Sequence, residues 1–522
     1  MPLTTENGRI CMSSFTAGYD FVIVGAGSAG CVLAARLSQD ESAHVLLLEA
    51  GSSQRTESMA LPPAWPTLIG SSADWGDATV VQAANGMAIP FPRGKTLGGS
   101  SAINAMFFVR GHRSSYDAWP AAGAKGWGFD DLLPYFRRTE RAHGRDPALR
   151  GDEGPVVVAP MEPDPFMTAG LQAAVEAGHR AATDVSGGLE EGFGWMDVSI
   201  RDGRRCGAAE AYLDAEVRSR PNLTVVTDAL VHRVRVHDGR CTGVEYSVEH
   251  GTGSEVLVAE CREEVVLTAG AVGSAQLLML SGVGPQAHLD ERGVEVVLDL
   301  PGVGANFHDH PLSMVAYTPV QPVPTGVGNH SGVIGLMSSP VAADGPDLQL
   351  IISDMPLYGP GLRGPDHAYA IVFSAVRPYS RGTVRLGSAE PGAAPLIDPN
   401  YYADPRDLDV MAAGLDAART LGRTLALDPW RGEEVVPGPG VRDAEGVRDY
   451  LRRSLGTYFH PVGTCRIGPD GDGMAVVDPD LRVHGISGLR VADASVMPSI
   501  VSGNTNSTVY AIAERAADLI RR

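Results

Sequence analysis

The residues best suited to binding chemistry lie between positions 20 and 51, in the stretch DFVIVGAGSAGCVLAARLSQDESAHVLLLEAG. Gly25, Gly27 and Gly30 form the pattern G-x-G-x-x-G. Such glycines allow a tight turn, let the backbone approach a pyrophosphate and let a helix pack closely on a strand. Glu49 follows at roughly the 20-residue spacing of a carboxylate that binds a ribose 2′-hydroxyl. Because this carboxylate would repel a 2′-phosphate, the motif favours FAD or NAD over NADP.

A strand–turn–helix–strand unit is needed to position these residues. The apolar run 21–24 predicts a buried strand, helix formers follow Gly30, and 45–48 predicts a second buried strand. The N-terminus of a helix at this turn would direct free N–H groups and a positive dipole end at a phosphate. A glycine-rich turn in some other α/β protein is the alternative, but strand, spacing, helix and acid all agree.

A second glycine- and serine-rich segment, FPRGKTLGGSSAINAMFFVRG, spans residues 91–111. It precedes 102–109, whose residue spacing is compatible with a helix. Two phosphate-friendly loops would allow the chain to hold an extended dinucleotide from two sides. A plain surface loop would not need so many permissive residues before an apolar run.

Composition excludes several classes of protein. With 522 residues, 44% hydrophobic and 20% charged, the chain is long enough for two or more globular domains. The formal net charge of −20 disfavours nucleic acid or an anionic membrane as a partner, since both need a basic footprint.

The six cysteines are scattered without metal-binding spacing, so we expect free thiols. The chain shows no secretory signal and no apolar run long enough to span a membrane, and we expect a cytoplasmic protein. Either Met1 or Met12 is the start, because the folded chain is expected to begin near Tyr19.

Five segments together resemble the glucose–methanol–choline (GMC) oxidoreductase family, which uses FAD. They are GAGSAG with Glu49, GKTLGGSSAINAM at 94–106, GAVGSAQLLMLSGVGP at 270–285, HPVGTCRIG at 460–468 and LRVADASVMPSIVSGNTNSTVYAIAERAADLI at 489–520. Each segment alone is modestly specific, but their order identifies the chain as a member of the family.

The resemblance implies an α/β fold (α+β overall): a Rossmann-like FAD-binding domain with a discontinuous substrate domain on a mixed, largely antiparallel sheet. We expect residues 17–157, 202–311 and 460–522 in the FAD-binding domain, and 158–201 and 312–459 in the substrate-binding domain. The residue patterns predict strands at 223–226, 231–236, 264–268, 348–352, 383–386 and 489–491, helices at 207–217, 274–280, 411–421, 444–454 and 506–520, and irregular structure at 158–201.

Oxidation of an alcohol needs a group that accepts the hydroxyl proton while a hydride leaves the α-carbon for flavin N5, and histidine suits this task. The chain has 14 histidines, so residue type alone identifies none. By the resemblance, His460 in HPVGT is the base or holds the alkoxide, and Asn504 hydrogen-bonds the substrate oxygen. A satisfied structural histidine is the alternative for His460.

The resemblance also implies which residues contact FAD. They are Gly25, Gly27, Ser28, Ala29, Gly30, Glu49, Ala50, Trp75, Arg93, Leu97, Gly99, Ser100, Asn104, Ala105, Met106, Phe107, Val231, Gly270, Asp493, Ala494, Asn504, Thr505 and Asn506. The positive end of the helix near Thr505 would lie by the flavin N1–C2=O locus; plain N-capping is a compatible role. Ile103 fills the position where relatives with covalent FAD carry histidine, so non-covalent FAD is implied.

His308, Asp309 and His310 form H-D-H, which invites interpretation as a metal site. No third ligand can be named, so hydrogen bonding is favoured and no metal is expected.

The leading hypothesis is an FAD-dependent alcohol oxidase or dehydrogenase acting on a small-molecule alcohol with molecular oxygen or another electron acceptor, as a monomer or homodimer. A flavin-dependent lyase or decarboxylase on the same fold is the alternative, and a non-catalytic flavoprotein is a third reading. Tyr458 occupies a position where some family oxidases carry valine, which lowers the odds of an oxidase.

The substrate is expected to be an uncharged primary alcohol, aromatic or hydrophobic. A quaternary ammonium needs a carboxylate or an aromatic cage. Choline-oxidising relatives carry glutamate two residues after the histidine of their D-H segment, where this chain has Leu312. A carboxylate from elsewhere, such as Asp354, is the alternative that would admit choline.

Overall fold

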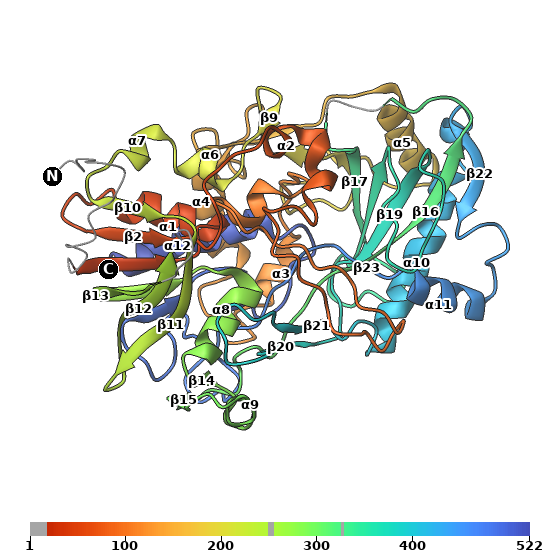
Figure 1. The fold of residues 1–522 in the computed structure, drawn as a ribbon. Coiled ribbons are helices and arrows are strands. Elements are labelled where there is room, and N and C mark those ends of the chain that lie inside the picture. The colour runs from red at the N-terminus through yellow and green to blue at the C-terminus, as the bar shows by residue number, and fades with distance from the viewer. Residues whose placement is uncertain (1–17, 249–254, 325–327) are drawn as a thin grey trace.

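The computed structural model describes residues 18–248, 255–324 and 328–522. Two seven-stranded sheets dominate it, and they lie toward opposite sides of the view in Figure 1. Met12, the alternative start, and Cys11 lie outside the described residues. The other five cysteines are buried and unpaired, as the sequence predicts. Across the described ranges, no helix has both the length and the apolar character needed to cross a bilayer.

The first sheet contains the predicted nucleotide-binding unit. Its strands are β1 (Tyr19–Val24), β2 (Val45–Leu48), β10 (Leu223–Val226), β11 (Ala229–His237), β12 (Arg240–Val248), β13 (Val256–Leu267) and β24 (Leu489–Val491). The order is β10-β2-β1-β13-β12-β11, with β24 also paired to β13. Strand β13 is longer than predicted because its first half pairs antiparallel with β12, while its second half pairs parallel with β1 and β24.

Four helices belong to this part of the fold: α1 (Ser28–Leu37), α4 (Phe129–Thr139), α8 (Gly270–Leu280) and α12 (Asn506–Ile520). Helix α1 packs on β1 and β2, and α8 packs on β11. Helix α12 packs against both α1 and α4, and it buries Ala511, Ile512 and Ala516 at the predicted helical spacing. The start of α8 is earlier than predicted because the Asp493 carboxylate accepts bonds from the Gly270 N–H and the Ser274 hydroxyl.

The second sheet is formed by the middle of the chain. Its strands are β6 (Gly192–Trp195), β16 (Pro311–Pro319), β17 (Ser331–Met337), β18 (Leu348–Ser353), β19 (Tyr369–Ala375), β22 (Arg431–Val436) and β23 (Gly456–Thr457). The order is β22-β16-β19-β18-β17-β6, with β23 beside β16, and each of these pairs is antiparallel. Helix α10 (Pro405–Gly422) packs on β16, β18 and β19, and α5 (Pro165–Glu176) packs on β6 and β17.

The remaining elements are short. The helices are α2 (Glu57–Ala60), α3 (Arg113–Asp117), α6 (Ala208–Tyr212), α7 (Ala215–Arg218), α9 (Gln286–Arg292), α11 (Ala444–Arg453) and the 3-10 turns η1 (Pro62–Leu68), η2 (Gly99–Ala102), η3 (Leu425–Leu427) and η4 (Ala494–Val496). Two- and three-residue strands are β3 (Glu140–Arg141), β4 (Val156–Val157), β5 (Ala159–Pro160), β7 (Asp197–Val198), β8 (Ile200–Arg201), β9 (Arg204–Arg205), β14 (Val283–Gly284), β15 (Leu298–Asp299), β20 (Thr383–Arg385) and β21 (Leu396–Asp398).

Three local predictions are wrong. The helix expected over 102–109 is absent: the chain leaves η2 as irregular backbone, because the Asn104 side chain accepts the Met106 N–H and Met106 has a φ of 62°. Residues 158–201 are not irregular throughout, since Asp164 caps α5 and Pro165 occupies its first position. The helix predicted over 207–217 is divided into α6 and α7, because Asp214 caps a new start.

Two large hydrophobic cores accompany the two sheets. One combines residues of β1, β2, β13, α1 and α12, so it joins the beginning and the end of the chain. The other combines α5, α10 and the strands β16 to β19. We propose that these cores mark the two predicted domains.

Candidate active site

A cavity of about 410 Å³ lies between the two sheets. Its wall includes the turns after β1 and β2, the starts of α1, α8 and α12, and side chains from β16, β17, β18 and β19. The carboxyl ends of the parallel strands therefore meet the face of the antiparallel sheet at this cavity, which is where α/β proteins bind ligands.

The first glycine loop has the geometry that its sequence predicts. Gly25 has a φ of 100°, in the left-handed region that favours glycine. A Cβ atom on Gly30 would lie 1.9 Å from the Gly25 carbonyl oxygen, so only glycine permits this approach of helix and strand. Gly27, the N-cap of α1, provides no side-chain cap, so N–H groups of the first turn are left for a ligand.

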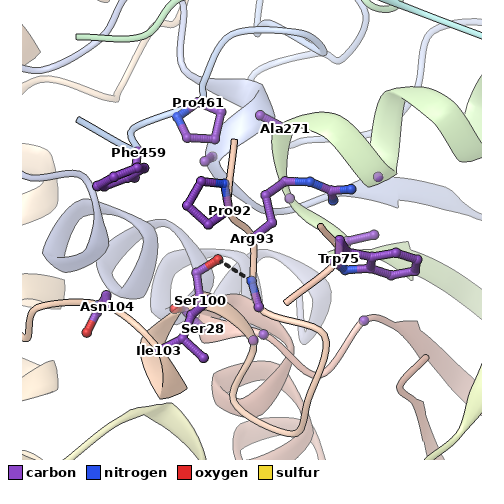
Figure 2. A pocket seen from close by; sticks show the side chains of 18 of the residues that line it. Ser28, Trp75, Pro92, Arg93, Ser100, Ile103, Asn104, Ala271, Phe459 and Pro461 are labelled. Atoms are coloured by element: carbon purple, nitrogen blue, oxygen red, sulfur yellow. Dashed lines mark hydrogen bonds between the residues drawn. The ribbon is translucent and has the colours of Figure 1, made fainter. Parts of the chain in front are cut away.

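The second glycine loop packs directly on the first. A Cβ atom on Gly99 would lie 2.7 Å from the Gly27 Cα atom, and the Gly98 N–H donates to the Ala26 carbonyl at 2.7 Å. Ser100 Oγ accepts the Gly94 N–H at 3.1 Å, the dashed bond in Figure 2. Both loops therefore present bare backbone to the same end of the cavity.

Glu49 lies at this end and is held by two backbone bonds. Its oxygens accept the Ala26 N–H and the Gly51 N–H, each at 2.8 Å. Burial raises the pKa of Glu49 to about 7, although both bonds act against this rise. The position and orientation of the carboxylate fit recognition of a ribose hydroxyl.

The start of α12 forms another part of the wall. Thr505, its N-cap, makes no side-chain capping bond. Asn506 accepts a hydrogen bond from the Ser28 hydroxyl at 2.7 Å, which ties the starts of α1 and α12 together. The N-termini of α1 and α12 thus meet the cavity side by side, and each favours a negatively charged or polar ligand group.

Of the residues predicted to contact FAD, all but two line this cavity. The exceptions are Gly30, whose role is the close packing described above, and Leu97, which is buried with its backbone N–H bonded to Ser52. Trp75 lies beside Arg93, whose guanidinium carbon is 5.3 Å from the ring centroid (Figure 2). Both oxygens of Asp493 accept hydrogen bonds from the protein itself. One accepts the Gly270 N–H and the Ser274 hydroxyl, and the other accepts the Ser495 N–H and hydroxyl.

The predicted catalytic pair is brought together. His460 Nε2 lies 3.2 Å from Asn504 Nδ2, and both residues line the cavity and are buried. Burial, and to a smaller extent His310, holds the pKa of His460 well below its usual value. His460 is therefore neutral near pH 7 and has a lone pair available to accept a proton.

The H-D-H segment supports His460. His310 Nδ1 lies 2.9 Å from His460 Nδ1, and the Asp309 carboxylate accepts the His460 backbone N–H at 2.6 Å. Asp309 also accepts the hydroxyls of Tyr401 and Thr457. No cluster of three or more metal-ligating side chains is found among residues 18–248, 255–324 and 328–522.

Leu312, which the sequence predicts to be relevant to substrate charge, lines the wall from β16. The second sheet also supplies Ser331, Ile351, Ser353 and Val372, and no local motif predicts these positions because the pairing of distant strands sets them. Trp65, Ile69, Leu357 and Phe459 also line the cavity.

Arg205 supports the cavity wall, although the sequence predicts no role for it. Its guanidinium donates to the carbonyls of Met59 and Asn104 and to the Asn104 side chain, at 2.6 to 2.8 Å. Burial lowers the pKa of Arg205 to about 9. Arg205 fixes Asn104 on the cavity wall, but an isolated arginine forms no motif.

The residues present fit FAD. The two bare glycine loops and the α1 start would hold the pyrophosphate, Glu49 would hold the ribose, and the α12 start would face the flavin. Ile103 lies on the wall in the attachment position and cannot form a covalent bond to a flavin.

Comparisons with known proteins agree with this geometry. Residues 19–312 and 378–513 match the two regions of the GMC oxidoreductase family. The chain is 36% identical to oxygen-dependent choline dehydrogenase of Rhizobium rhizogenes, covering 96% of this chain and 95% of that one. Identity to the mitochondrial choline dehydrogenase of Homo sapiens is 38%, covering 96% and 90%.

Among solved structures, pyridoxine 4-oxidase from Mesorbium loti superposes with a TM-score of 0.91 at 37% identity, covering 96% of this chain and 99% of that one. The family match and these full-length likenesses confirm the fold class and the FAD cofactor that the sequence predicts. The chain belongs to the GMC oxidoreductase family and is an FAD-dependent oxidoreductase.

Proposed function

We propose that the enzyme oxidises the CH–OH group of an uncharged primary alcohol, aromatic or hydrophobic, to the aldehyde, with His460 as the base. The observation that carries this proposal is the character of the cavity wall that the substrate-domain segments supply. It contains Leu312, Ile351, Leu357 and Val372, together with the aromatic ring of Phe459, and its polar members Ser331 and Ser353 are uncharged. Such a wall favours an apolar substrate body with one polar reacting group.

The acidic residues on the wall belong to the cofactor end and have partners. Glu49 accepts two backbone N–H groups, Asp77 pairs with Arg93, and Asp493 holds the start of α8. Asp354, the alternative carboxylate, pairs with His330 at 2.8 Å and is not among the wall residues. The described wall therefore offers a cationic substrate no unpaired carboxylate.

His460 and Asn504 are placed to handle the substrate hydroxyl. The hydroxyl proton would move to His460 Nε2, while the Asn504 amide would hydrogen-bond the oxygen and orient the α-carbon. Bound FAD would supply the acceptor for the hydride that leaves this carbon. Burial of the imidazole lowers the pKa of His460 and keeps it neutral before the reaction.

Choline oxidation is the second candidate, because the relatives at 36% and 38% identity are named choline dehydrogenases. Two observations count against it. Leu312 occupies the position of the glutamate that the family resemblance places in choline-oxidising relatives, and the carboxylates on the wall are already paired. Pyridoxine 4-oxidase, at 37% identity, is named for an aromatic alcohol instead.

The relatives named above are dehydrogenases and an oxidase, so they support oxidation over the lyase or decarboxylase alternative. The proposal includes molecular oxygen or another electron acceptor as second substrate, a cytoplasmic location, and a monomer or homodimer.

Steady-state turnover of purified holoenzyme tests the proposal. The panel contains benzyl alcohol, pyridoxine, 1-hexanol and choline, each assayed with oxygen and with an artificial dye as acceptor. We expect an uncharged aromatic or aliphatic alcohol to give the highest kcat/KM, and the ratio of peroxide to dye reduction to separate oxidase from dehydrogenase. Choline as the best substrate would overturn the assignment.

A further inference from the structure

His330, immediately before β17, bridges two hydrogen-bond acceptors from different parts of the chain. Its Nδ1 lies 2.8 Å from Asp354 Oδ1, and its Nε2 lies 2.9 Å from the Pro63 carbonyl oxygen. A neutral imidazole has one N–H and would turn a lone pair toward one of these acceptors. Both bonds therefore form only when His330 is an imidazolium, whose charge Asp354 compensates.

The segment bonded to His330, which contains η1, forms part of the cavity wall. Pro63 belongs to η1, and within the same segment the Trp65 indole N–H donates to the Asn329 carbonyl at 3.0 Å. Trp65 and Ile69 line the cavity, and so does Ser331, the first residue of β17. Two consecutive residues, Asn329 and His330, thus tie the Trp65 segment to the second sheet.

The backbone at His330 shows that this arrangement is imposed by its surroundings. Its φ is 68°, in the left-handed region that non-glycine residues rarely adopt. Such conformations persist where neighbouring bonds hold them, and they concentrate at functional sites.

We propose that protonated His330 is a positioning residue, which fixes Trp65 and the Pro62–Leu68 segment against the substrate part of the cavity. The substrate would then bind against a fixed indole wall, and loss of the His330 proton would release one of the two ties. The effect on catalysis rests on the proposed alcohol oxidation, whereas the effect on the segment does not.

The surroundings of His330 make its charge responsive to one group. The hydrogen bond to Asp354 raises the pKa of His330 more than burial lowers it. The packed elements η1, β17 and β18 contain no ionisable side chain, and Glu57, in the preceding helix, is paired with Arg204. Asp354 is therefore the charged partner that determines the protonation of His330 in the described part of the chain.

Hydrogen–deuterium exchange of the holoenzyme tests the tie directly. Peptides covering 57–69 are compared at the same pH in wild type, H330Q, D354N and H44Q, the last removing a surface histidine that lies 3.4 Å from Asp20. At pH 6 we expect about 10-fold faster exchange in H330Q than in wild type, the loss expected for one charged hydrogen bond. This difference should shrink as the pH is raised and His330 loses its proton, and H44Q should match wild type throughout.

Equal exchange in wild type and H330Q at pH 6 would overturn the proposal. D354N provides the same comparison if H330Q does not fold, and its exchange should exceed that of wild type at the same pH while wild-type His330 is protonated. Kinetics add a second readout: KM for the best alcohol should rise about 10-fold in wild type as His330 loses its proton, earlier in D354N, and not at all with pH in H330Q. Faster exchange without any alcohol oxidation would support the tie and contradict only the proposed function.

Discussion

His310 and His460 meet edge to face, with their Nδ1 atoms 2.9 Å apart and their ring planes at 89°. One of these two atoms must donate and the other accept. Asn504 Nδ2 approaches His460 from the other side, so the amide donates to His460 Nε2 and the His460 proton lies on Nδ1, toward His310. The contact with His310 thereby leaves the lone pair of His460 on the nitrogen that faces Asn504.

Removal of the His460 side chain should stop proton abstraction but leave FAD binding intact. The glycine loops, Glu49 and the start of α12, which would hold FAD, are positioned by other contacts. We expect His460→Ala to retain FAD and to slow anaerobic bleaching of the flavin by at least about 10²-fold. Asn504→Ala, which keeps the base, should slow it less. Stopped-flow absorbance with the best alcohol measures both, and bleaching at the wild-type rate in His460→Ala would identify another base.

The buried histidines should make the protein sensitive to mild acid. Burial lowers the pKa of His310 to about 3, whereas an unfolded histidine titrates near 6.5. Between these values the unfolded chain binds more protons than the folded one, so stability falls as pH is lowered through this window. His310→Gln removes this group, and its urea midpoint should fall less than that of wild type between pH 7 and pH 5. Parallel midpoints in both proteins would contradict the prediction; His44→Gln is the surface control.

Sequence patterns predicted the elements whose structure depends mainly on residues close together in the chain. The bounds of β2, β24 and α12 agree with prediction, because a mostly apolar run and helical spacing are properties of the segments themselves. The glycine loops were also predictable, since the close approaches at Gly25, Gly30 and Gly99 exclude every side chain.

The rest depends on contacts between distant segments. His310 and His460 are 150 residues apart. They meet because β16, which begins directly after His310, pairs with β23, which ends shortly before His460. Asp309 could not be identified as the group that holds the His460 backbone for the same reason. Residues 102–109 have helical spacing but do not form a helix. Asn104 and Met106 line the cavity, and the Asn104 side chain accepts the Met106 N–H in an irregular backbone.

Ile103 predicts how FAD is held. Its side chain lines the cavity in the position where covalently flavinylated relatives carry histidine, and a hydrocarbon provides no nucleophile. Acid precipitation of the purified enzyme should therefore release yellow flavin into the supernatant. Flavin that stays with the pellet would show a covalent bond at some other residue.

Leu312 is the position from which substrate charge selection can be tested. It lies two residues after His310 on β16, is buried, and lines the cavity. Leu312→Glu would place a carboxylate within the apolar wall, where a bound quaternary ammonium offsets the cost of burying it. We expect kcat/KM for choline to rise at least about 10-fold and that for the uncharged alcohols to fall.

Leu312→Gln is the matched control, because it has nearly the same shape as the glutamate variant but no charge. It should weaken apolar alcohols to a similar degree without the gain for choline, and FAD absorbance should report intact holoenzyme in both variants. A rise in kcat/KM for choline in Leu312→Gln would show that side-chain shape, and not charge, selects the substrate. Efficient choline turnover by the wild-type enzyme would show that the apolar wall around His460 accepts a cation without a carboxylate at position 312.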